Sequence, residues 1–64
     1  MNQHKLAIKD SKQAGYIFDR AGRNHDIYWN PDLNRKIPLK RHDFDEGDRR
    51  YINKEIERNR GDSK

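Results

Sequence analysis

The residue best suited to catalysis in this sequence is His25, which follows a turn-forming run at 21–24. An imidazole titrates near neutral pH, so it can move a proton to or from a ribose hydroxyl or a leaving oxygen. RNA carries its own nucleophile, the 2′-hydroxyl, and its metal-free cleavage needs a base, an acid and cations near the phosphate. Arg20, Arg23 and Lys36 lie on or beside the same predicted hairpin and are candidates to hold that phosphate.

Each of these residues could also be present without any catalytic or binding role. A histidine at a turn is more commonly an exposed bystander, and cations on a small sheet are commonly solvated charges. His42, near the start of the last predicted helix, is a second candidate proton carrier, although a linker histidine with no chemical role is the commoner case. The run 42–46 adds three carboxylates to this imidazole, but no second histidine lies at ligand spacing, and acids suit a helix start. We therefore predict no metal site.

The composition indicates one small domain over residues 1–60, followed by a disordered tail at 61–64. Of the 64 residues 30% are hydrophobic and 41% are charged, and the apolar residues concentrate between positions 16 and 44, which is enough for one thin core. Because cysteine is absent, neither disulfides nor a thiolate zinc site can support the fold. No apolar run suits a membrane span or a signal peptide, so we expect a cytoplasmic protein without a membrane partner. The net charge of +4 favours a nucleic-acid partner only weakly.

Two helices and three strands are predicted to position these residues. The expected helices cover residues 2–14, closing at Gly15, and 48–58, capped by Asp45 or Asp48; the expected strands cover 16–20, 25–30 and 35–39. Pro38 cannot donate to a ladder, which places the third strand at a sheet edge or makes Pro38 its last paired residue; a three-stranded meander, whose third strand lies on the outside, meets that requirement. Tyr28 and Trp29 should point to opposite faces, so that at most one is available for base stacking. The order predicts an α+β fold, the αβββα arrangement of double-stranded RNA-binding domains, with both helices on one face of a three-stranded antiparallel sheet.

Four short motifs occur in an order that resembles the HicA family of toxins. They are AGY at 14–16, GRNH at 22–25, IPLKRH at 37–42 and GDRRYINK at 47–54. In that family a helix-ending glycine precedes an aromatic residue, a hairpin turn of the form G-S-H or G-S-N-H follows, and a later V/I-P step precedes a helix like G-T-L-R-x-I-L-K. The resemblance covers roughly residues 5–56.

The resemblance implies a metal-independent endoribonuclease that cleaves mRNA without a small-molecule cofactor. It also implies that the protein is the toxin of a type II toxin–antitoxin pair, whose HicB-type antitoxin covers the catalytic histidine. That histidine falls on His25, and Gly22 and Asn24 match the turn around it. The chain departs from the pattern at Arg23, which stands where serine is usual. It also has Asp10-Ser11 in place of two aliphatic residues and Asp48-Arg49 in place of Thr-Leu.

Two other functions fit the same residues. The ribonuclease is expected to act on single-stranded or loosely structured mRNA. A non-catalytic RNA-binding module could use this fold and these cations, and incubation of the purified protein with total RNA in EDTA separates the two, because only the enzyme should cut. A small protein-interaction domain could present its basic face to an acidic partner. Loss of toxicity when the partner is co-expressed favours the toxin over that alternative.

Overall fold

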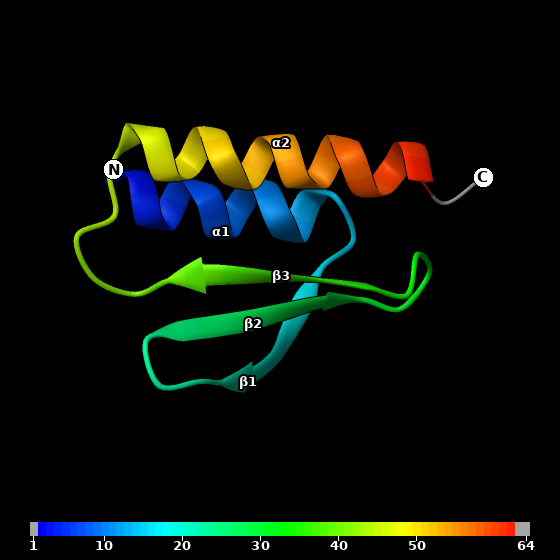
Figure 1. The fold of residues 1–64 in the computed structure, drawn as a ribbon, viewed down its shortest axis with the longest axis horizontal. Coiled ribbons are helices and arrows are strands. Elements are labelled where there is room, and N and C mark those ends of the chain that lie inside the picture. Colours follow the sequence, from blue (N-terminus) through cyan, green and yellow to red (C-terminus); the bar gives the residue numbers. More distant parts are fainter. Residues whose placement is uncertain (1, 63–64) are drawn as a thin grey trace.

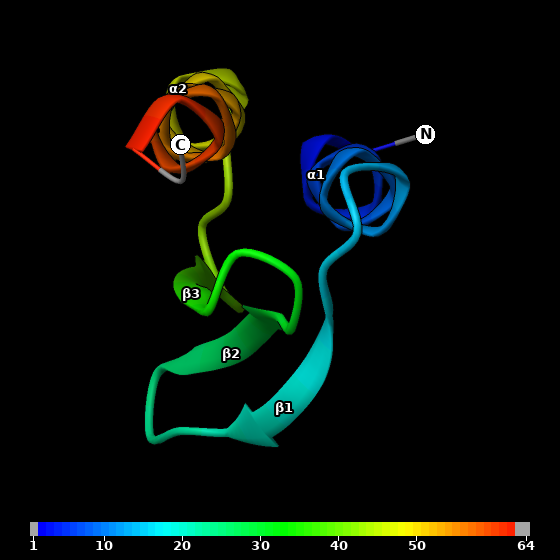
Figure 2. The same ribbon diagram turned by 90° about the vertical axis from the view of Figure 1, so that its right-hand side faces the viewer.

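The computed structural model of the protein describes residues 2–62, and its helices and strands follow one another in the predicted order (Figure 1). The elements are α1 (Gln3–Gln13), β1 (Ile17–Ala21), β2 (His25–Asn30), β3 (Arg35–Lys40) and α2 (Glu46–Asp62). The strands form one antiparallel sheet in the order β1-β2-β3. Both helices lie side by side on one face of this sheet (Figure 2). The αβββα fold is thus confirmed, and β3 with its Pro38 is an edge strand as predicted.

Helix α1 ends at Gly15 as the sequence predicts. Gly15 adopts a φ of 96°, in the left-handed region that glycine tolerates best. The N–H of the next residue, Tyr16, donates to the carbonyl of Ser11 at 3.0 Å, which satisfies one of the free carbonyls of the last helical turn. This turn directs Tyr16 into the core, where its hydroxyl accepts a hydrogen bond from Asn59 at 3.0 Å. Strand β1 therefore starts one residue later than predicted.

Helix α2 begins at Glu46 rather than at the predicted residue 48. Both candidate capping residues, Asp45 and Asp48, form hydrogen bonds at the start of the helix. Asp45 Oδ1 accepts from the N–H of Asp48 at 3.0 Å, and Asp48 Oδ2 accepts from the N–H of Asp45 at 3.0 Å. This reciprocal pair satisfies two backbone donors at the helix start, as in a capping box.

The prediction of a disordered tail at residues 61–64 is wrong for residues 61 and 62. Helix α2 continues through Gly61 and Asp62, whereas Ser63 and Lys64 lie outside the described residues. The extension has a physical cause, because Ile56 and Asn59 are buried against the core and fix the last turns of the helix. No helix in the described part of the chain is long and apolar enough to cross a membrane.

One apolar layer between the helices and the sheet forms the core. It consists of Ala7, Tyr16, Tyr28, Ile37, Leu39, Ile52 and Ile56. Ser11 is fully buried in the same layer, and its hydroxyl donates to the carbonyl of Ala7 at 2.9 Å. A buried hydroxyl with such a partner avoids the cost of an unsatisfied polar group. The departure from an aliphatic residue at position 11 is therefore accommodated inside the helix.

An aspartate of α1 pairs with an arginine and an asparagine of α2. Asp10 Oδ2 accepts a hydrogen bond from Arg49 Nε at 2.9 Å and another from Asn53 Nδ2 at 3.0 Å. The hydrogen bond from Arg49 is the main cause that lowers the pKa of Asp10 below its ordinary value, and the bond from Asn53 adds to it. A partly buried ion pair therefore joins α1 to α2.

Candidate active site

The turn that carries His25 is closed by its own backbone. The N–H of Gly22 donates to the carbonyl of His25 at 2.7 Å. A Cβ atom at position 22 would lie 2.9 Å from that carbonyl oxygen, closer than real Cβ contacts come, so the tight turn requires glycine. The predicted hairpin turn is confirmed, with Gly22 and Asn24 inside it.

Arg41, which follows β3, holds this hairpin from the other side. Its Nη1 donates to Asp26 Oδ1 at 2.9 Å, and its Nη2 donates to the carbonyl of Gly22 at 2.7 Å and to the carbonyl of Arg23. Its backbone N–H donates to the carbonyl of Asn24 at 3.3 Å. We call Arg41 and Asp26 the hairpin clamp. A guanidinium suits this position because its planar fork offers several fixed donors at once.

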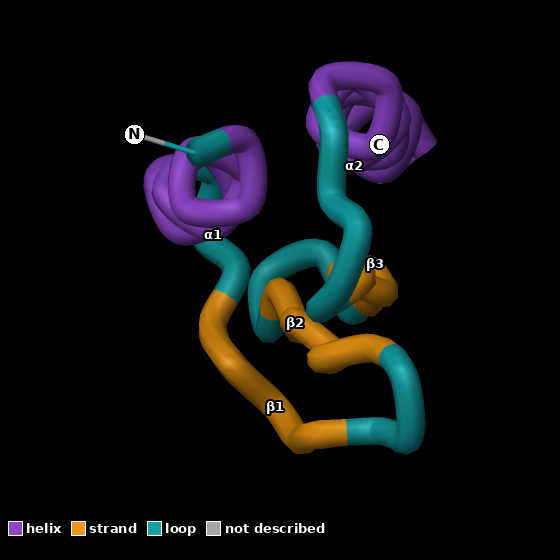
Figure 3. The backbone as a smooth tube through the Cα atoms, turned by 90° about the vertical axis from the view of Figure 1, so that its left-hand side faces the viewer, coloured by secondary structure: helices purple, strands orange, loops and turns teal. Residues whose placement is uncertain are grey.

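His25 is exposed at the start of β2, on the face of the sheet that is turned away from the helices. It lies directly opposite Lys40, the last residue of β3. The β1–β2 turn, the end of β3 and the start of α2 lie at the same end of the molecule (Figure 1), and the tube in Figure 3 shows the turn on the side away from the helices. A cavity of about 180 Å³ opens there, and it is lined by His25, Pro38, Lys40, Phe44, Asp48, Tyr51 and Ile52.

The charged groups of this cavity are a loose ion pair beside the imidazole. Lys40 Nζ lies 3.4 Å from Asp48 Oδ2, and the two side chains are 42% and 30% exposed. The pKa of Asp48 is lowered first by the hydrogen bond from the N–H of Asp45 and then by Lys40. Because an ion pair this exposed contributes little to stability, the ammonium group of Lys40 can turn to a phosphate at small cost.

The predicted phosphate-binding residues lie at different distances from His25. Residues directly opposite each other in the sheet share a face, so the register places Arg20 beside Ile27, one row from His25 on the same open face. Lys36 lies on that face too, but it is opposite Trp29, and four residues of strand separate the two rows by about 13 Å. The register therefore places Lys36 two rows from His25, farther along the sheet than Arg20.

Arg23 is exposed in the turn next to His25. The second candidate proton carrier, His42, is exposed in the loop after β3 and is not among the residues that line the cavity. Lys40 and Tyr51 line it instead, and neither was predicted as a site residue. Among the described residues, no group of three or more histidine, aspartate and glutamate side chains is placed to hold a metal ion.

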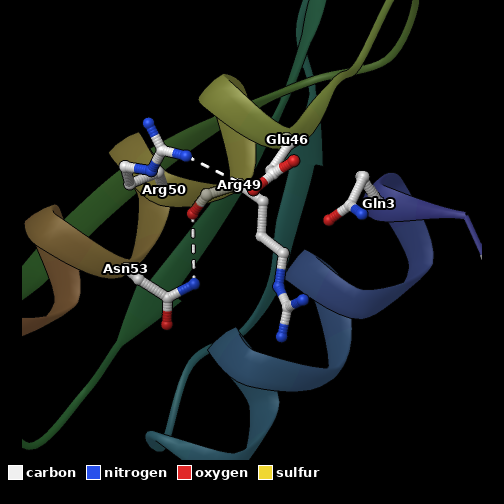
Figure 4. A pocket seen from close by; sticks show the side chains of 5 residues that line it. All are labelled: Gln3, Glu46, Arg49, Arg50 and Asn53. Atoms are coloured by element: carbon white, nitrogen blue, oxygen red, sulfur yellow. Dashed lines mark hydrogen bonds and ion pairs between the residues drawn. The ribbon is translucent and has the colours of Figure 1, made fainter.

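A larger cavity of about 280 Å³ lies along the helices, lined by Gln3, Glu46, Arg49, Arg50 and Asn53 (Figure 4). Arg49 is bound to Asp10 there, and Arg50 Nη2 lies 3.3 Å from Glu46 Oε1 in a weak, exposed ion pair. This cavity contains no imidazole or hydroxyl. The smaller cavity beside His25 is thus the better candidate active site.

The chain matches no protein-family model, no curated protein sequence and no solved structure. The functional assignment therefore depends on the motifs and on the geometry of the cavity beside His25.

Proposed function

We propose that this protein is a metal-independent endoribonuclease that cleaves mRNA, with His25 as a proton-transfer group. One observation carries the proposal: an exposed histidine, held in a clamped turn, shares a cavity with an ammonium group and a phenol, those of Lys40 and Tyr51. An imidazole and a phenol can each transfer a proton, and an ammonium group can stabilise a phosphate, which are the roles that cleavage through the 2′-hydroxyl of RNA requires.

The reaction balances with these groups alone. A base takes the proton of the 2′-hydroxyl, the 2′-oxygen attacks phosphorus, and the bond from phosphorus to the 5′-oxygen breaks. An acid then returns a proton to the 5′-oxygen, which leaves a 2′,3′-cyclic phosphate and a 5′-hydroxyl. His25 serves as the base or the acid in this proposal, and Tyr51, which lines the same cavity, serves as its counterpart. Lys40 and Arg20 stabilise the charge that develops on the phosphate.

A substrate substitution tests this mechanism directly. We expect the purified protein to cut an RNA oligonucleotide in EDTA, and to spare the same oligonucleotide when the nucleotide before the cut carries 2′-deoxyribose. Products should end in a cyclic phosphate. Binding without any cut would favour the non-catalytic RNA-binding module, and cleavage of the 2′-deoxy substrate would contradict attack by the 2′-hydroxyl.

The order of the motifs supports a more specific role, that of a cytoplasmic toxin of the HicA type. In this role a HicB-type antitoxin covers the β1–β2 hairpin and the basic edge of the sheet, because that position blocks His25 and the phosphate-binding residues together. The net charge of +4 favours an acidic partner, so association should slow as salt is raised. Expression of the chain should inhibit growth, and co-expression of the antitoxin should restore it. A complex whose interface lies wholly on the C-terminal half of α2 would contradict this role.

A further inference from the structure

The face of the sheet opposite the helices carries an apolar strip next to the candidate active site. The strip consists of Ile17, Trp29, Ile27 and Pro38. In the register, Ile17, Trp29 and Lys36 form one row across the strands, Arg20, Ile27 and Pro38 form the next, and His25 and Lys40 form the third. Figure 2 shows both helices on the other side of the sheet, and within the described chain α2 approaches this face only at the cavity that its residues share with His25.

Trp29 is the largest side chain of this strip and lies in the central strand. Its neighbour on the same strand, Tyr28, is buried in the core, whereas Trp29 is half-buried on the open face. The prediction that these two aromatics point to opposite faces is confirmed. The indole is therefore the aromatic surface in this row that a ligand can reach.

The charges around Trp29 suit a polyanion. Lys36 Nζ lies 5.9 Å from the centre of the indole ring and 3.7 Å from Asp19 Oδ2. The Lys36 side chain is 53% exposed, so its pair with Asp19 is weak and a phosphate can displace it. With Arg20 in the next row and Lys40 in the third, cations flank the strip along its whole length. Charge complementarity thus favours nucleic acid over an apolar protein partner.

An aromatic ring on a basic sheet binds unpaired bases. Every base has a flat face that can stack on an aromatic side chain, whereas a duplex keeps these faces inside its own stack. Trp29 and His25 lie on the same strand and the same face, about 13 Å apart. A few nucleotides of single strand can bridge that distance.

We propose that the open face binds single-stranded RNA, with one base stacked on Trp29, Lys36 on an adjacent phosphate, and the strand leading to His25. This inference rests on the proposed ribonuclease function and adds the substrate class and the residue that selects it. Trp29 is in this account a binding residue, and it takes no part in the proton transfers.

Trp29 is the only tryptophan in the chain, so its fluorescence reports on the contact itself. The test uses the full chain with His25→Ala, so that the probe stays intact, and an RNA oligonucleotide of about ten nucleotides, within the range of known single-strand sites. We expect the single strand to change the emission of Trp29 saturably and a duplex of the same sequence to leave it almost unchanged. Unchanged emission at saturating single strand would overturn the proposal.

Variants measure the contribution of the ring. Loss of one base stack corresponds to at least about a fivefold change in affinity, and we expect Trp29→Leu to weaken single-strand binding about tenfold, whereas Trp29→Phe should retain most of it. Phe18→Leu is the matched control, because Phe18 is a 52% exposed aromatic that packs edge-on against Tyr28, on the other face. It should bind as the wild type does. Equal binding by Trp29→Leu would contradict the proposal, as would a dimer in sedimentation that Trp29→Leu abolishes.

The same Trp29 and Phe18 variants, made with His25 intact, distinguish the proposed RNA-stacking surface from the proposed ribonuclease activity. If single-stranded RNA binds through Trp29 but is never cut, the stacking surface stands and the ribonuclease function is wrong. If RNA is cut and Trp29→Leu binds and cuts as the wild type does, the ribonuclease function stands and the stacking surface is wrong.

Discussion

His25 and Lys40 lie directly opposite each other at the end of the β2–β3 ladder, and both line the cavity at the start of α2. The pairing of the two strands thus places a cation beside the imidazole. Lys40 Nζ also lies 3.4 Å from Asp48 Oδ2, in an ion pair whose two side chains are partly exposed.

Removal of this cation should slow cleavage. We expect Lys40→Ala to lower the single-turnover rate about a hundredfold, since it removes a positive charge from the site of the phosphate and leaves Asp48 to repel it. Lys40→Arg should retain most of the rate. Lys54→Ala is the matched control, because it removes one exposed positive charge from α2 away from the cavity. Equal rates for Lys40→Ala and Lys54→Ala would show that Lys40 has no role at the phosphate.

The hairpin clamp should stabilise both the fold and the position of His25. Arg41→Ala removes the donors to Asp26, Gly22 and Arg23, and we expect it to lower the free energy of unfolding by about 1–3 kcal/mol. The amide of Gly22 should then exchange faster, because its bond to the His25 carbonyl loosens. Thermal denaturation and hydrogen exchange measure the two effects.

Arg50→Ala serves as the control for the clamp. Its pair with Glu46 joins side chains that are 67% and 77% exposed, so its loss should change stability by less than about 0.5 kcal/mol. If Arg41→Ala behaves in the same way as Arg50→Ala, the clamp does not hold the hairpin.

The pair between Asp10 and Arg49 predicts a dependence of stability on pH. Arg49 lowers the pKa of Asp10 in the folded protein. Its contribution is therefore complete above the unfolded pKa of about 3.9 and is lost as the pH falls through the lower folded value. We expect Asp10→Asn to cost about 0.5–1 kcal/mol at pH 7 and to match the wild type at low pH, because asparagine resembles the protonated acid. Urea unfolding at several pH values measures this, and a difference that stays constant with pH would contradict it.

The fold could be predicted from local signals because its boundaries are local. Gly15 ends α1, the run around Gly22 makes the hairpin turn, and Asp45 and Asp48 begin α2. The end of α2 was missed because Asn59 is held by Tyr16, a residue 43 positions away, and no local signal shows that contact.

The candidate site was predicted only in part for the same reason. His25 could be identified from its turn, but Lys40 reaches it through strand pairing, and Arg41 reaches Asp26 and Gly22 across 15 and 19 residues of chain. Conversely, Lys36 is close to the hairpin in the sequence, yet the register moves it about 13 Å along the sheet from His25. Distances across a sheet follow from its register, which the sequence patterns did not specify.

Cleavage by His25→Ala in EDTA tests the central claim most directly. General acid–base catalysis is typically worth about 10²- to 10⁴-fold in rate, so the variant should cut RNA at least a hundredfold more slowly and should no longer inhibit growth. Because cations supply most of the affinity for RNA, its binding should remain close to that of the wild type and remain dependent on salt. His42→Ala, which removes an exposed histidine outside the cavity, should cut normally. With circular dichroism showing all three proteins folded, a loss of cleavage confined to His25→Ala is the predicted result. A folded His25→Ala protein that cuts at the wild-type rate would contradict the account.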